Sequence, residues 1–211
     1  MVKTLIHFPT LSNTARTIAI YRCSNPPTMP SPLTSTAGET LSFVASWKGR
    51  HAVVSVLHRL GADVNATDSL GRTPVYAACL KNRRKTVEVL HGLGADVDRP
   101  NGNGRTPCAI AAWKGRLEIL RTLHKLGADV NHTVDHHKTT PCCVAAACGR
   151  SDVIKVLHQL GANLELATES GSTPVMMAAS RGHVEAVRTL HGLGADIEKV
   201  GNRVTWIHSR T

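Results

Sequence analysis

One unit of 33 residues recurs along this chain and constrains its fold more than any other feature. Each copy contains a Gly-Ala-Asp or Gly-Ala-Asn anchor, and the successive anchor glycines are 33, 33, 34 and 33 residues apart: Gly61, Gly94, Gly127, Gly161 and Gly194. A Thr-Pro pair recurs in the same phase, beginning at Thr73, Thr106, Thr140 and Thr173. A period of this length, kept over five copies, predicts an array of stacked units.

Each unit has the pattern of two short helices. In the stretch 71–103, Thr73 can cap a helix that begins at Pro74, because a hydroxyl accepts from free helix N–H groups and proline suits the first helical position. A second apolar stripe at helical spacing ends at Gly94, where turn residues lead into the next unit. Neither helix is long enough to be stable alone in water. The units must therefore bury their apolar stripes against one another, and a small Ala-Ala pair permits that close approach.

The order Thr-Pro, Ala-Ala, Gly-Arg or Gly-His, Leu and Gly-Ala-Asp resembles the ankyrin repeat over about residues 38–203. The resemblance implies an all-α, ankyrin-type α-solenoid of helix–turn–helix units with β-turn or finger connections. We expect five repeats, at about 38–70, 71–103, 104–137, 138–170 and 171–203. We expect the fingers on one side, at about 66–72, 99–105, 132–139 and 166–172.

The two ends of the chain depart from the repeat. Residues 1–37 contain no Asp or Glu and are rich in Ser, Thr and Pro, which predicts a flexible leader. The same composition fits an organelle transit peptide, so targeting stays open beside a cytoplasmic or nuclear location. Residues 204–211 include Thr205-Trp206-Ile207-His208, which resembles the opening of a sixth repeat that is cut short. Since the fifth repeat keeps its internal apolar pattern, we expect its outer face to be poorly covered.

Composition limits the partners and the compartment. The formal charge is +10 and only 3% of residues are aromatic, which suits a thin solenoid and makes an acidic partner surface the natural complement. The six cysteines are scattered, and most of them fall on predicted apolar helix positions, a usage typical of a reduced, intracellular protein. The sequence shows no phosphate-binding loop, nucleophile elbow or metal-ligand spacing, so we expect no enzyme activity and no cofactor or metal.

Candidate partner-binding residues come from the ankyrin resemblance. In that family the two positions after the Ala-Ala pair face a concave groove and select partners. The resemblance assigns to this groove Trp47, Lys48, Leu80, Lys81, Trp113, Lys114 and Arg181. It adds four finger residues: Arg72, Arg105, His136 and His137. Tryptophan beside cations is typical of interface hot spots, whereas the simpler alternative is that the cations favour helix C-termini and the tryptophans cover repeat junctions.

Two functions fit this pattern. The first is a protein–protein interaction module that binds a partner protein through the groove and the finger tips. The alternative is a basic binder of nucleic acid or another polyanion, which would use a stripe of cations at the turn between the two helices of each repeat. We call these residues the basic stripe: Arg50, Arg83, Arg84, Lys85, Arg116, Arg150 and His183.

Overall fold

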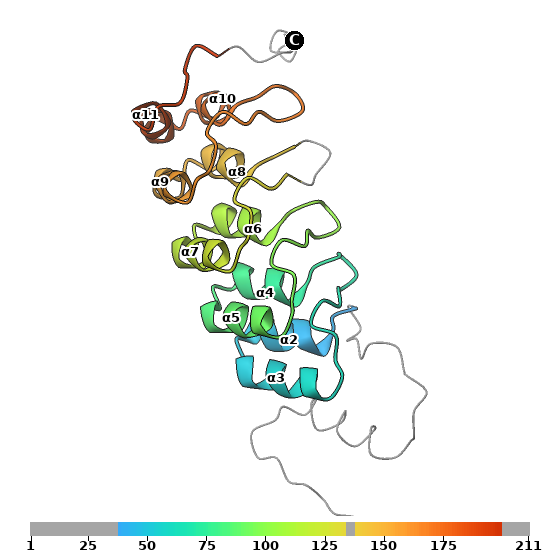
Figure 1. The fold of residues 1–211 in the computed structure, drawn as a ribbon. Coiled ribbons are helices and arrows are strands. Elements are labelled where there is room, and N and C mark those ends of the chain that lie inside the picture. The colour runs from blue at the N-terminus through green and yellow to red at the C-terminus, as the bar shows by residue number, and fades with distance from the viewer. Residues whose placement is uncertain (1–37, 134–137, 200–211) are drawn as a thin grey trace, which may run out of the picture. The chain divides into compact units, whose positions relative to one another are not determined.

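The computed structural model describes residues 38–133 and 138–199, and these contain ten α-helices arranged as five consecutive pairs (Figure 1). The pairs are α2 Leu41–Lys48 and α3 His51–Arg59, α4 Pro74–Leu80 and α5 Arg84–Gly92, α6 Pro107–Lys114 and α7 Leu117–Lys125, α8 Pro141–Ala147 and α9 Ser151–Gln159, and α10 Pro174–Ser180 and α11 Val184–Gly192. Within the described ranges there is no β-strand. The expected all-α solenoid and its five helix pairs are confirmed.

The helices stack in two rows. The first helices of the pairs pack on one another from α2 to α10, and the second helices pack from α3 to α11, while the two helices of each pair also touch (Figure 1). The connecting loops project from the first-helix row toward one side, as expected for the fingers. The segments predicted as a leader (1–37) and as the start of a sixth repeat (204–211) lie outside the described residues, as do residues 134–137 of the third finger and 200–203 of the fifth repeat.

A threonine begins every first helix. The Oγ1 of each accepts a hydrogen bond from the backbone N–H three residues on, at 3.1 Å in four repeats and 3.4 Å in the fifth, the caps being Thr40, Thr73, Thr106, Thr140 and Thr173. Proline follows in all but the first repeat, where Leu41 stands. Because the hydroxyl satisfies a backbone donor that the helix itself cannot, the cap keeps its position in the first repeat without proline.

The core lies between the rows and across each junction. Small residues of the first helices, such as Ala78 and Ala111, are fully buried and let neighbouring first helices approach closely. The second helices supply the larger side chains, and the largest fully buried ones include Leu90, Leu120 and Leu157. Each repeat therefore buries its apolar surface only against its neighbours, so a single repeat is not stable unless it stacks on another.

Backbone hydrogen bonds and one side-chain ladder join adjacent fingers. Asn65 of the first repeat accepts from the N–H of Asp96 at 2.9 Å through Oδ1 and donates from Nδ2 to the carbonyl of Gly94 at 3.2 Å. Asn131 of the third repeat makes the same pair of bonds to Asn163 and Gly161 of the fourth repeat. Glu165 keeps only the acceptor half of the pattern, accepting from the N–H of Asp196 at 2.9 Å.

Asp98 occupies the equivalent ladder position between the second and third repeats. Its Oδ2 accepts from the N–H of Asp129 at 3.0 Å, but its Oδ1 is buried and has no hydrogen-bond partner. By equivalence with Asn65, this oxygen stands where an amide would donate to the carbonyl of Gly127, so two acceptors meet. Burial raises the pKa of the Asp98 carboxyl, opposed by the Asp129 N–H and by His132 and reinforced by the Asp129 and Asp96 carboxylates.

We expect Asp98→Asn to stabilise the array by about 1–2 kcal/mol at pH 7, because it supplies the missing donor at a buried site. An acid whose folded pKa lies above its unfolded value destabilises the protein when ionised, and this penalty disappears as the pH falls below both values. The advantage of the variant should therefore shrink between pH 7 and pH 4 in urea unfolding. Asn65→Asp is the matched control, expected to lose stability at pH 7. An Asp98→Asn variant no more stable than the native chain at pH 7 contradicts this account.

Candidate functional site

The C-terminal ends of the first helices carry the predicted binding residues. Each first helix ends within two residues of its small-residue pair, because a residue with positive φ follows, for example Gly115 at +69° or Asn82 at +58°. The side chains at the last positions therefore leave the packed core. Trp113 at the end of α6 is 40% exposed, and Lys48, Lys81 and Arg181 are exposed. We call this column of helix ends, with Trp47, Leu80 and Lys114, the first-helix face.

Trp47 belongs to a cluster that spans the first two repeats. Its ring stacks on the buried ring of Phe43, with centroids 6.0 Å apart and an interplanar angle of 29°. Lys81 from α4 places its Nζ 4.0 Å from the Trp47 ring centroid, and the Arg72 guanidinium lies 4.8 Å from the centroid of Phe43. Cations over ring faces are attracted by the ring quadrupole. Trp47 is half-buried, so part of its role is to join α2 to α4.

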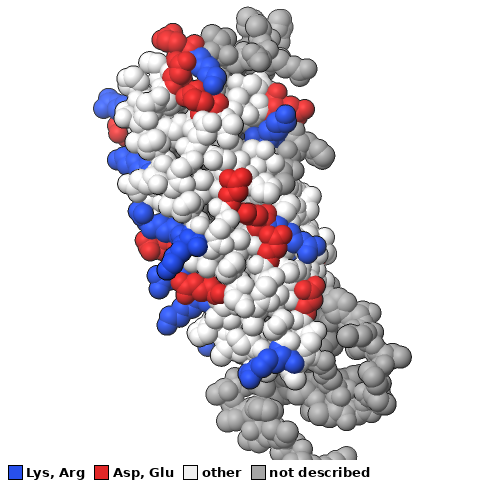
Figure 2. Space-filling model, viewed as in Figure 1, with Lys and Arg blue, Asp and Glu red and all other residues white. Residues whose placement is uncertain are grey.

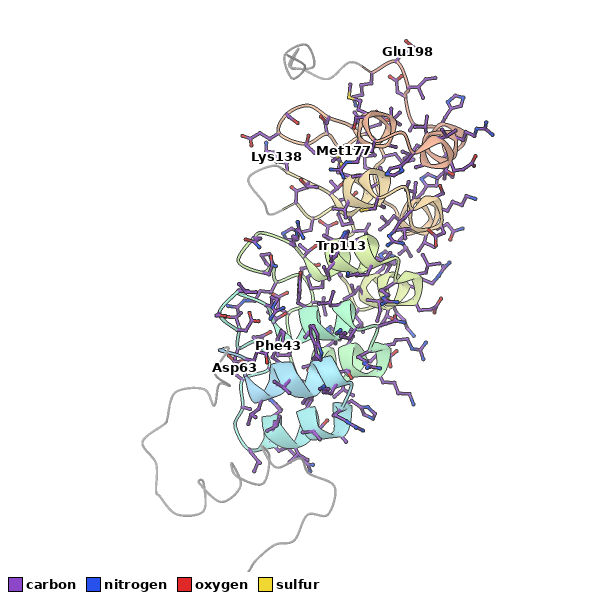
Figure 3. The ribbon with its side chains drawn as sticks, turned by 180° about the vertical axis from the view of Figure 1, so that it is seen from behind. Phe43, Asp63, Trp113, Lys138, Met177 and Glu198 are labelled. Carbon is purple, nitrogen blue, oxygen red and sulfur yellow. The ribbon has the colours of Figure 1, made fainter. Side chains whose placement is uncertain are left out.

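Trp113 is more open and more independent. Its contacting cation is its own neighbour, Lys114, whose Nζ lies 3.6 Å from the ring centroid. Figure 3 labels Trp113 on the first helix of the third repeat. The carbonyl of Trp113 accepts from Nε of Arg150 at 2.8 Å, which fixes the helix end that carries the ring. The result is a large apolar surface on a rigid backbone with an ammonium group beside it. The two tryptophans, which look alike in sequence, are therefore different: Trp47 is partly structural and Trp113 is presented to solvent.

The predicted finger residues also separate. Arg72 is held by Asp68, whose buried carboxylate accepts from Nε of Arg72 at 2.6 Å and from its backbone N–H at 2.8 Å, so this side chain braces its own finger. Four residues before Arg105 the chain has Asn101, which carries no carboxylate to hold the guanidinium. The side chain of Arg105 is exposed. Of the two predicted finger arginines Arg105 is therefore the exposed one, whereas His136 and His137 lie outside the described residues. The aspartate four residues before Arg72 is the sequence signal that distinguishes the two arginines.

Part of the basic stripe has a structural role that the sequence did not reveal. Arg150 reaches back to the carbonyl of Trp113, and Nε2 of His183 lies 3.1 Å from the carbonyl of Ala147. Both side chains cover the C-terminus of the first helix in the preceding repeat. The side chain of Arg83 lies over Gly49 in the same way, since a Cβ there would be 2.8 Å from its Cδ. Cations at helix C-termini are favourable, which accounts for the basic residue at this position in the second, fourth and fifth repeats.

Other cations on the second helices are balanced by acids. Arg84 lies 3.6 Å from Glu88 on α5, and Arg121 lies 3.7 Å from Glu118 on α7. Figure 2 shows Lys and Arg side chains intermixed with Asp and Glu side chains on this face of the molecule. A surface of mixed sign does not present the continuous positive potential that a polyanion needs.

Four of the five described cysteines are buried, and Cys148 is partly exposed. Cys79, Cys108, Cys142 and Cys143 are buried and none is in a disulfide. Burial raises the pKa of Cys108 and of Cys142 to about 12, and the pKa of Cys79 rises well above its ordinary value. Since the thiolate is the nucleophile, these side chains act as small hydrophobic groups in the junctions.

Comparison with known families agrees with this geometry. The family model described as ankyrin repeats (3 copies) matches residues 41–134 and 131–200. The chain belongs to the ankyrin-repeat family. Ankyrin repeats generally serve as protein–protein interaction modules and are typically non-enzymatic. No curated protein matches this ankyrin chain. Among the described residues, no helix has the length and apolar character needed to cross a membrane.

Proposed function

We propose that this ankyrin array binds a partner protein through the first-helix face of repeats one to three, with Trp113 as the central apolar anchor. The observation that carries the proposal is the exposure of the Trp113 ring on a helix end that Arg150 holds in place. Truncation of tryptophans and arginines at interface centres produces the largest losses of affinity, and rigid aromatic side chains lose little entropy on binding.

The charges beside the ring indicate the chemistry of the partner. Lys48, Lys81 and Lys114 lie along the first-helix face, and none of them has an ion pair with a described residue. The fourth repeat offers only Ala147 and Cys148 at these positions, so the combination of rings and ammonium groups is confined to the first three repeats. A partner segment that places an apolar side chain against Trp113 and carboxylates against the lysines would complement this face.

We expect Trp113→Ala to weaken partner binding strongly while leaving the fold nearly unchanged. Loss of a central anchor reduces affinity by ~2 kcal/mol or more, about 30-fold, whereas loss of an exposed ring with one cation contact reduces stability by about 1 kcal/mol or less. The measurement is affinity capture with the full chain, followed by titration of the captured protein and by thermal melting of each variant. Val184→Ala, which truncates an exposed apolar residue on α11, is the control and should bind as the native chain does.

Two outcomes would contradict the proposal. A Trp113→Ala variant that melts several degrees early would make the ring a junction residue, and one that retains full affinity would remove it from the interface. Titration with a labelled DNA duplex at 50 mM and 200 mM salt tests the polyanion alternative, because binding there should weaken with a log–log slope of about −0.9 per phosphate neutralised. The cytoplasmic or nuclear location expected from the sequence stays a prediction.

A further inference from the structure

The N-terminal end of the array exposes one half of a repeat junction. Val56 of α3 is 44% exposed, and Leu60, which follows the end of that helix, is 51% exposed. In later repeats the equivalent residues are covered by the preceding repeat: Val156 is buried, and Leu93 is partly buried against the core. The first repeat therefore presents an apolar surface that the described residues leave uncovered, whereas later repeats pack the equivalent side chains against the core.

The C-terminal end exposes the other half. Ile197 is 50% exposed, although the residues at its position in the first four repeats (Val64, Val97, Val130 and Leu164) are all buried. Ala179 is exposed where Ala112 is fully buried, and Val187 is only half-buried where Leu120 is fully buried. A shallow apolar hollow at this end is lined by Ala179, Val184 and Val187.

The polar parts of the junction are also divided between the two ends. At internal junctions a side chain of one finger accepts from the backbone N–H of the next, as Asn131 does from Asn163 at 2.8 Å. Asp63 carries the equivalent N–H at one end of the array, and Glu198 carries the equivalent acceptor at the other (Figure 3). Within the described ranges neither group has such a partner.

The helix cap that links neighbouring repeats is split in the same way. Arg150 and His183 reach the last carbonyls of the first helix in the preceding repeat. Arg50 holds the same position in the first repeat and is exposed, and the carbonyl of Ser180 is the equivalent acceptor at the end of α10.

We propose that this chain stacks head to tail with a second copy of itself, with α3 of one copy packed against α11 of the next as α9 packs against α11 within the chain. The apolar residues, the ladder and the helix cap would each be completed by this one contact. The surfaces are heterologous, so the contact does not close on itself and leaves a free half at each end of the assembly. Self-association should therefore increase steadily with protein concentration, without a fixed stoichiometry.

Charge substitutions in the two halves distinguish this arrangement from any other. We expect sedimentation velocity on the full chain to show a mass that increases with concentration. Val56→Glu removes one half and Ile197→Glu the other, so each variant alone should be monomeric at every concentration. An equimolar mixture of the two retains one intact half on each partner and should form dimers but nothing larger. Leu70→Glu, at an exposed position on a finger, is the control and should associate as the native chain does.

Two results would overturn the proposal. Persistent dimers of either single variant would show a symmetric contact and overturn the proposal. A native chain that stays monomeric, as expected if residues 1–37 or 200–211 cover these ends, overturns it too. Leu60→Glu provides a second variant of the N-terminal half, and circular dichroism of each variant confirms that the array is folded before its mass is interpreted.

Discussion

Leu120→Ala should destabilise the array by about 3–5 kcal/mol, in the range observed when fully buried leucines are truncated. Leu120 lies in the middle of α7, in the third of five repeats, and its side chain is fully buried. Its removal deletes apolar contacts and leaves a cavity that short, stacked helices can close only by shifting a neighbouring repeat. Since each repeat contacts only its neighbours, a defect at the centre weakens the coupling between the two halves.

Urea unfolding followed by circular dichroism measures this loss. The control is Leu70→Ala, which truncates the same side chain at a finger position that is 56% exposed and should change stability by no more than about 0.5 kcal/mol. A broadened or two-step transition in Leu120→Ala would show the halves unfolding separately. Similar losses for the two variants would mean that α7 is not packed in solution as the structure has it.

Gly71→Ala should cost about 2–4 kcal/mol because two effects combine at this finger. Gly71 has a φ of +69°, a conformation that costs an L-residue about 1–2 kcal/mol. A Cβ there would also lie 2.5 Å from the backbone N of Gly102, which donates to the carbonyl of Leu70 at 2.9 Å and joins the first finger to the second. Relief of the clash requires the two fingers to separate, with the loss of that hydrogen bond.

Gly94→Ala isolates the conformational part of this effect. Gly94 has a φ of +85°, but a Cβ there would meet nothing within 4 Å. We therefore expect it to lose only the ~1–2 kcal/mol of the backbone term, with the further loss in Gly71→Ala measuring the contact between fingers. Equal losses for the two alanine variants in thermal or urea unfolding would exclude a tight approach of Gly102 to Gly71.

Much of the fold could be predicted from local chemistry. A threonine hydroxyl caps a helix through a backbone donor three residues away, and a left-handed residue ends a helix through its own φ, so these signals act within a few residues of where they stand. The fixed period then requires that every pair of short helices bury its apolar stripe against the next. For that reason the helix pairs, their phase and the position of the first-helix face follow from residues such as Thr106 and Gly127.

The roles of individual side chains were decided by the neighbouring repeat. Trp47 and Trp113 occupy the same position in their repeats. Phe43 and Lys81 contact the Trp47 ring at a junction, whereas the Trp113 ring is exposed to solvent. In the sequence Arg150 has the pattern of a surface cation. In the structure it caps the first helix of the preceding repeat, because stacking brings its Nε to 2.8 Å from the carbonyl oxygen of Trp113. Asp98 has the pattern of a normal turn residue, and only the junction shows that its Oδ1 stands where a donor is needed. The sequence alone determined the architecture through short-range capping and periodicity, whereas contacts about one repeat apart determined which charges and rings remain free to bind.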